Sequence, residues 1–121
     1  MKKILVADDQ FSVAKSLSEL LTSAGYEVTL ASDGEMAIEL AKKMKPDIII
    51  MDVMMPKKSG IDAVKSIRGI EELKSVYIIF ISLKNQFNDE KRALEAGGNS
   101  FIYKPFSPKK MLEEINQVFN K

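Results

Sequence analysis

The sequence of 121 residues contains no cysteine and no histidine. Without cysteine, the chain has no disulfides, no thiolate nucleophile and no cysteine-ligated zinc. Without histidine, it has neither a Ser-His-Asp triad nor histidine ligands for a metal. The side chains left for chemistry are carboxylates, hydroxyls, lysines and tyrosines, and this set suits hard cations such as Mg²⁺.

Excess charge and long apolar runs are missing as well. The formal net charge is +1, so no overall field attracts nucleic acid or an anionic membrane surface. The apolar runs are far shorter than the ~20 residues of a membrane span, and Asp8 and Asp9 interrupt the run that follows the basic start. Hydrophobic residues make up 45% and charged residues 29% of the chain, as in a globular domain. We therefore expect one domain over residues 1–121, located in the cytoplasm.

Apolar runs alternate with helical patterns along the whole chain. The apolar runs predict buried strands at residues 3–7, 26–31, 47–51, 76–81 and 99–103. Helices are predicted between Asp9 and Gly25, from a capping box at Ser32 and Glu35 to Pro46, over 61–70 and 85–96, and after an N-cap at Ser107. This alternation predicts a three-layer α/β/α fold with a doubly wound, parallel five-stranded sheet.

Polar side chains stand where the apolar runs end. Asp8 and Asp9 follow the first run, Asp52 the third, Ser82 the fourth and Lys104 the fifth. If the strands are ordered 2-1-3-4-5, these side chains meet at one edge of the sheet, where ligands bind in such folds. Carboxylates ~4 Å apart repel by about 4 kcal/mol at an effective dielectric constant near 20, and Lys104 alone cannot neutralise the group. A divalent cation can, and the combination suits a phosphoryl group.

Each of these residues also has an ordinary structural interpretation. The Asp8-Asp9 pair, and likewise Ser82, would cap the helix that follows. Lys104 would be a solvated strand end. Asp52 fits such an interpretation least, because its apolar run places it beside the core, where an unpaired carboxylate is costly.

The motifs "LVADD", "IIIMDVMMPKKSG", "FIS" and "YKPF" resemble those of the receiver domain of bacterial two-component response regulators. The resemblance covers essentially the whole chain, which is similar to single-domain chemotaxis and sporulation receivers. It implies a flavodoxin-like fold with strand order 2-1-3-4-5. It also implies a signalling switch, not an enzyme with turnover on external substrates.

The same resemblance implies roles at the site. Asp52 would accept a phosphoryl group from the phosphohistidine of a sensor histidine kinase or a histidine phosphotransfer protein. Asp9, Asp52 and the backbone carbonyl of Met54 would bind Mg²⁺ or Mn²⁺, and Asp8 would act through water. Lys104 would contact the phosphoryl oxygens.

Further positions would transmit the signal. Ser82 would shift toward the phosphoryl group, and Tyr103 would turn inward into the space this opens. The surface that responds would be the fourth helix, fifth strand and fifth helix, read by a downstream target protein or an output domain. The peptide bond between Lys104 and Pro105 is expected to be cis.

The rim of the site departs from the family. Leu83 stands where a small residue is usual, Lys84 offers no carboxylate or amide to orient water, and Met54 is apolar. We therefore expect slow autodephosphorylation. Pro56 and Gly60 would shape the loop after the acceptor.

Other interpretations stay open. The first alternative to a stand-alone receiver is a receiver cut from a larger regulator with a DNA-binding or enzymatic output domain. A Mg²⁺-dependent phosphatase of the haloacid-dehalogenase type would carry a second aspartate where this chain has Met54. A flavodoxin would have a hydroxyl-rich loop in place of "DDQFS". An inactive receiver would lack part of the acid, hydroxyl and lysine set. No direct partner among nucleic acids or membranes is expected.

Overall fold

The structure is a computed structural model that describes residues 1–83 and 89–120. Its centre is a parallel five-stranded sheet in the order β2-β1-β3-β4-β5, which confirms the predicted fold class and strand order. The strands are β1 (Lys3–Ala7), β2 (Glu27–Ala31), β3 (Ile48–Asp52), β4 (Tyr77–Leu83) and β5 (Ser100–Lys104). The helices are α1 (Phe11–Ser23), α2 (Gly34–Met44), α3 (Gly60–Arg68), α4 (Asp89–Ala96) and α5 (Pro108–Phe119), with a short 3₁₀ helix, η1, at Glu71–Leu73.

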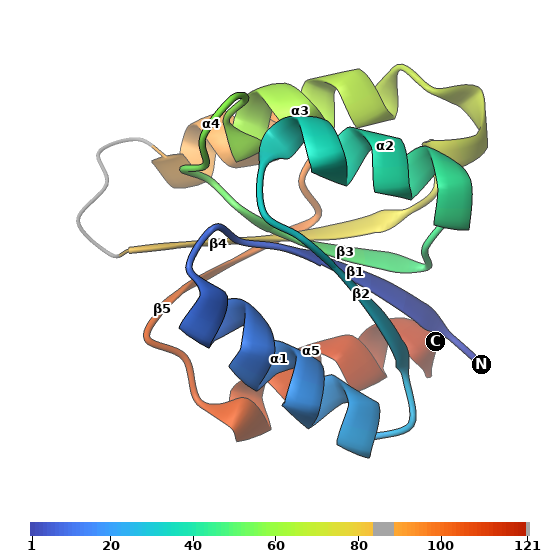
Figure 1. The fold of residues 1–121 in the computed structure, drawn as a ribbon, viewed down its shortest axis with the longest axis vertical. Coiled ribbons are helices and arrows are strands. Elements are labelled where there is room, and N and C mark those ends of the chain that lie inside the picture. The colour runs from blue at the N-terminus through green and yellow to red at the C-terminus, as the bar shows by residue number, and fades with distance from the viewer. Residues whose placement is uncertain (84–88, 121) are drawn as a thin grey trace.

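Helices cover both faces of the sheet, and each face has its own core. Figure 1 shows α2, α3 and α4 on one side of the sheet and α1 and α5 on the other. Alternate residues of a strand point to opposite faces, so Leu5 and Ile49 belong to one core and Ile4 and Ile48 to the other. Strands buried on both faces have continuous apolar sequences, and this is why they are predictable from the sequence.

The cap of one helix differs from its prediction, and the cap of another agrees. The N-cap of α2 is Asp33, whose carboxylate accepts a hydrogen bond from the Met36 backbone N–H at 2.8 Å. The capping box predicted at Ser32 is therefore wrong. The N-cap predicted at Ser107 is confirmed, because its hydroxyl accepts a hydrogen bond from the Lys110 N–H at 3.0 Å.

Two helices on the α2–α4 side also differ in their bounds. α3 ends at Arg68 instead of Ile70. The helix predicted over 85–96 is present as α4 from Asp89 onward, whereas residues 84–88 lie outside the described residues. No helix in the described part of the chain has the length and apolar character needed to cross a membrane.

Candidate functional site

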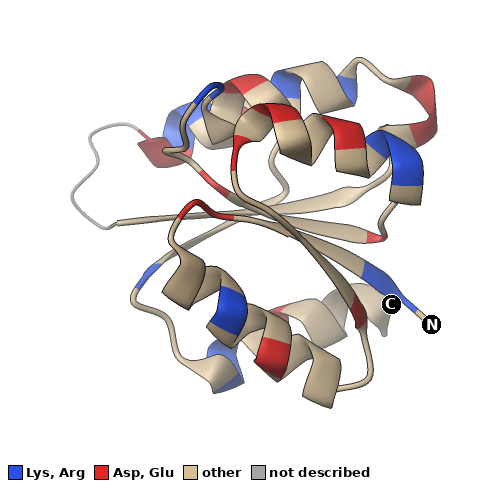
Figure 2. Cartoon of the chain, viewed as in Figure 1, with Lys and Arg blue, Asp and Glu red and all other residues tan. Residues whose placement is uncertain are grey.

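Three carboxylates meet where β1 and β3 end. Asp8 and Asp9 follow β1, Asp52 is the last residue of β3, and the two strands are neighbours in the sheet. Oxygen atoms of the three side chains lie within 4.8 Å of one another. Figure 2 shows acidic segments of the ribbon at this end of the sheet. The structure therefore brings together the acids that the sequence places at this edge.

Asp8 belongs to this cluster and does not cap α1. The N-cap of α1 is Gln10, whose backbone N–H donates a hydrogen bond to Asp8 Oδ1 at 2.9 Å. The other oxygen, Asp8 Oδ2, is buried and accepts no hydrogen bond from the described residues, although a lysine ammonium lies beside it. Because the same lysine also lies beside Asp52, it offsets only part of the negative charge on this oxygen. This oxygen is therefore available to a ligand.

Lys104 reaches the acids from the end of β5. Its Nζ lies 3.0 Å from Asp8 Oδ2 and 3.3 Å from Asp52 Oδ2, and it donates a hydrogen bond to Gln10 Oε1 at 3.0 Å. The lysine side chain is only 10% exposed, which excludes its interpretation as a solvated strand end. The peptide bond from Lys104 to Pro105 is cis.

The electrostatics of the cluster favour an additional cation. Burial of Asp52 and, next, the neighbouring charge of Asp8 raise the pKa of Asp52 to about 6, although Lys104 acts to lower it. One lysine thus faces more negative charge than it can neutralise. The donor atoms are carboxylate oxygens, including the Asp8 Oδ2 that accepts no hydrogen bond, and such a set fits Mg²⁺. Asp8, Asp9 and Asp52 are therefore the side chains that could hold a divalent cation.

Ser82 and Tyr103 lie side by side on neighbouring strands. Ser82 is buried inside β4, one position beyond the residue that pairs with Asp52, so it does not cap a helix. Tyr103 lies at the surface, where its hydroxyl donates a hydrogen bond to Glu90 Oε1 of α4 at 2.7 Å. The pair therefore connects the strand beside Asp52 with the α4 surface.

The loop between β3 and α3 returns to the acid cluster. The Gly60 N–H donates a hydrogen bond to the Val53 carbonyl at 2.8 Å. A Cβ atom at Gly60 would overlap the backbone carbonyl of Asp52, so glycine alone fits this close approach. Met54 and Pro56 are exposed on the same loop. Met54 therefore presents an apolar side chain at the rim of the site.

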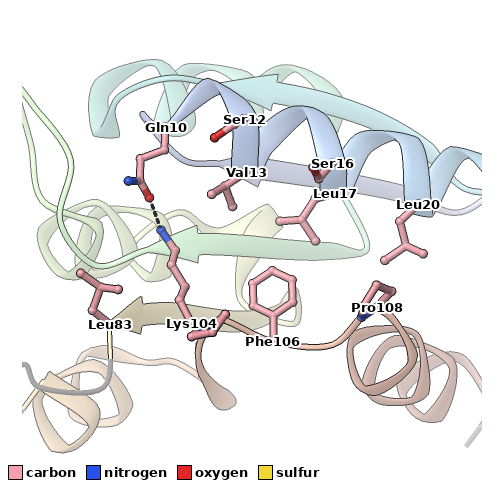
Figure 3. Close-up of a pocket in the computed structure, with 11 residues that line it drawn as sticks. Gln10, Ser12, Val13, Ser16, Leu17, Leu20, Leu83, Lys104, Phe106 and Pro108 are labelled. Carbon is pink, nitrogen blue, oxygen red and sulfur yellow. Dashed lines mark hydrogen bonds between the residues drawn. The ribbon is translucent and has the colours of Figure 1, made fainter.

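A hollow of about 480 Å³ adjoins the cluster, between α1 and the segment that follows β5. Figure 3 shows Gln10 and Lys104 joined by a hydrogen bond at one part of its lining, with Leu83, Leu17 and Phe106 among the other lining residues. No motif in the sequence predicts Gln10 as a site residue. The sequence also does not mark Gln10 as the N-cap of α1, which only the structure shows.

Fold and site together define a flavodoxin-like α/β domain with a lysine-bridged acid cluster at the carboxyl edge of its sheet. The chain belongs to the response regulator receiver domain family, whose sequence profile matches residues 4–116. This match confirms the resemblance drawn from the sequence motifs.

Similar proteins include both short and long response regulators. The chain is 40% identical to the chemotaxis protein CheY of Thermotoga maritima, covering 97% of each chain. It is 37% identical to the alkaline phosphatase synthesis transcriptional regulatory protein PhoP of Bacillus subtilis, where 99% of this chain spans 49% of the relative.

Solved structures agree with the sequence relatives. The chemotaxis protein CheY4 of Vibrio cholerae superposes with a TM-score of 0.91 at 33% identity, covering 98% of each chain. The receiver domain of the sensor histidine kinase PA1611 of Pseudomonas aeruginosa superposes with a TM-score of 0.92 at 29% identity, covering 99% of this chain and 98% of that one. The structure of that receiver has a magnesium ion coordinated in the active site cleft.

Proposed function

We propose that residues 1–121 form one cytoplasmic receiver domain that accepts a phosphoryl group on Asp52. The observation that carries the proposal is the position of this carboxylate. It is buried, its pKa is raised to about 6, and it lies 3.3 Å from Lys104 Nζ beside two further acids. Membership of the receiver family supports the same role.

A divalent cation would complete the acid cluster. Asp9, Asp52 and the backbone carbonyl of Met54 would hold Mg²⁺ or Mn²⁺, with Asp8 acting through water. When bound, the cation would neutralise the acids together with the oxygens of an incoming phosphoryl group. The magnesium ion in the related PA1611 receiver supports this assignment.

In the transfer step, a carboxylate oxygen of Asp52 attacks the phosphorus of a phosphohistidine. The new P–O bond forms as the P–N bond breaks, and the released imidazole takes a proton from solvent. Lys104 offsets the charge of the phosphoryl oxygens. Because residues 1–121 contain no histidine, the donor lies outside them, on a sensor histidine kinase or a histidine phosphotransfer protein.

Ser82 and Tyr103 would carry the change to the surface. Ser82 would move to hydrogen-bond the phosphoryl group, and Tyr103 would leave its partner Glu90 and turn inward. The surface of α4, β5 and α5 would then favour a different partner, a downstream target protein or an output domain. Phosphorylation shifts an existing equilibrium here, and the domain is a switch with no turnover on external substrates.

A second candidate is the receiver part of a longer regulator. The chain spans about half of PhoP, at 49%, but 97% of the Thermotoga CheY. Both candidates use the same acid cluster and differ in what reads the output surface. The reading frame beyond Lys121 in the genome distinguishes them.

The phosphorylated form should also be long-lived. Leu83 and Met54 place exposed apolar side chains at the rim of the site, and Lys84, outside the described residues, offers no carboxylate or amide to orient water. Lys84→Glu should speed decay of the acyl phosphate severalfold, whereas Lys91→Glu, on the exposed side of α4, should not. Decay in the wild type as fast as in Lys84→Glu would overturn this expectation.

The proposed phosphorylation has a simple test. The wild type and Asp52→Asn are incubated with Mg²⁺ and acetyl phosphate, and intact mass is measured. We expect one phosphoryl adduct on the wild type and none on the variant. No adduct on either protein contradicts the proposal, and sustained turnover of a generic phosphate ester would support the phosphatase interpretation instead.

A further inference from the structure

Gln10 contacts two reactive groups of the site but has no role in the mechanism above. Its carboxamide oxygen accepts the hydrogen bond from Lys104 Nζ at 3.0 Å, as Figure 3 shows. Its backbone N–H donates to Asp8 Oδ1 at 2.9 Å. One residue thus contacts both the lysine and an acid of the cluster.

The structure of α1 does not explain this glutamine. Gln10 is the N-cap of the helix, yet its side chain makes no capping hydrogen bond. Serine, threonine, aspartate and asparagine are preferred at this position, because their short side chains reach the free N–H groups of the first turn. The Gln10 backbone carbonyl accepts from the N–H groups of Val13 and Ala14, which fixes the backbone from which the side chain extends. The length of the side chain is used to reach Lys104.

Lys104 needs such a contact because its other partners take part in the reaction. An ammonium has three donors, and oxygens of Gln10, Asp8 and Asp52 lie 3.0, 3.0 and 3.3 Å from Nζ. Both acids change their interactions when a cation or a phosphoryl group arrives. Gln10 is uncharged and lies outside the acid cluster. Its contact with Lys104 is therefore the one that remains when a cation or a phosphoryl group binds. A lysine side chain is otherwise flexible.

We propose that Gln10 is a positioning residue whose carboxamide holds the Lys104 ammonium over the acid cluster, ready for the phosphoryl oxygens. The consequence for phosphoryl transfer rests on the proposed function. The hydrogen bond between Gln10 and Lys104 is present in the unphosphorylated protein. It can therefore be tested without phosphorylation.

The first test uses Gln10→Asn in metal-free protein. Asparagine is a better N-cap than glutamine, so α1 is retained, but its amide is one methylene shorter. In ¹⁵N NMR spectra of lysine ammonium groups, we expect the Lys104 signal, assigned with Lys104→Arg, to be protected from solvent exchange in the wild type. The protection should be lost in Gln10→Asn and Gln10→Ala, and should return in Gln10→Glu, which restores an acceptor of full length. Ser12→Ala, in the first turn of α1, is the control and should keep the protection.

The second test measures phosphorylation by acetyl phosphate at saturating donor. Gln10→Asn and Gln10→Ala should react about three- to tenfold more slowly than the wild type, the range expected for one hydrogen bond. A cap role alone predicts an equal or faster rate for Gln10→Asn. The proposal is wrong if the Lys104 ammonium stays protected from solvent exchange in Gln10→Asn. It is also wrong if that protection is lost while the rate of phosphorylation stays unchanged. If the wild type itself is not phosphorylated, the proposed function fails, and the NMR result still decides the contact.

Discussion

The amino edge of the sheet is the side at which the strands begin. There the Arg68 guanidinium donates hydrogen bonds to the Gly97 and Val76 carbonyls and to Asn99 Oδ1, at 2.7 to 2.9 Å. At the carboxyl edge, by contrast, three carboxylates share one lysine, and a buried oxygen of Asp8 accepts no hydrogen bond from the described residues. The amino edge pairs its polar groups within the chain. The carboxyl edge leaves negative charge for a ligand to neutralise. Local rules of stability are thus broken at the edge that carries the candidate site.

Removing the amino-edge guanidinium should have the largest effect. Arg68→Ala leaves the Gly97 and Val76 carbonyls without their donor and should lower the free energy of unfolding by about 2 to 4 kcal/mol. Urea unfolding followed by circular dichroism measures this loss. Lys74→Ala, which removes a lysine paired at the surface with Glu71, should change the value by less than about 0.5 kcal/mol. An equally small change in Arg68→Ala would contradict the contrast between the edges.

Adding Mg²⁺ should stabilise the whole protein against unfolding, through contacts at the carboxyl edge alone. At a concentration of 100 times its Kd, the ion should raise the free energy of unfolding by about 2.7 kcal/mol. Asp9→Asn should lose most of this gain, because it removes an acid of the cluster. Arg68→Ala should keep the gain, since its defect lies at the other edge. Thermal unfolding with and without Mg²⁺ measures the difference, and equal stabilisation of Asp9→Asn and the wild type would count against the metal assignment.

The smallest expected effect is a pH dependence from Asp52. Its pKa is about 6 in the folded protein against 3.8 for the free side chain, so the folded state binds the proton more tightly. The stability gained from this proton is fully present below about pH 4 and is lost as the pH rises through about 6. In metal-free buffer near pH 8, Asp52→Asn should therefore be more stable than the wild type by about 1 to 3 kcal/mol.

Urea unfolding of both proteins at the two ends of this pH range measures the difference. The advantage of Asp52→Asn over the wild type should shrink as the pH falls toward 4. A variant that is less stable than the wild type near pH 8 would contradict the electrostatic description of the carboxyl edge.

The strands and the polar residues that follow them are predictable because each depends on local sequence. A run such as Ile48–Met51 is apolar throughout only if both of its faces are buried, and Asp52 is then placed by the same strand. The α2 cap is a harder case. Ser32 and Asp33 are adjacent, and both residue types suit an N-cap, so the sequence alone does not distinguish them. The structure shows that Asp33 is the N-cap.

The contacts that distinguish the edges join residues far apart in the chain. Gln10 and Lys104 are separated by 94 positions, and Arg68 and Gly97 by 29. Such pairs depend on side-chain lengths and directions after the sheet has assembled, and no periodic pattern encodes them. The sequence therefore predicts which edge carries the acids. It does not predict the hydrogen bond that positions Lys104 there, or the hydrogen bonds of Arg68 at the opposite edge.

The most direct measurement locates the phosphoryl group on the chain. The wild type is incubated with Mg²⁺ and acetyl phosphate, the acyl phosphate is reduced with borohydride, and the peptides are sequenced by mass spectrometry. Reduction converts a phosphorylated aspartate to homoserine. We predict homoserine at position 52 and aspartate at positions 8 and 9. Homoserine at another acid, with Asp52 unchanged, would contradict the assignment of Asp52 as the acceptor.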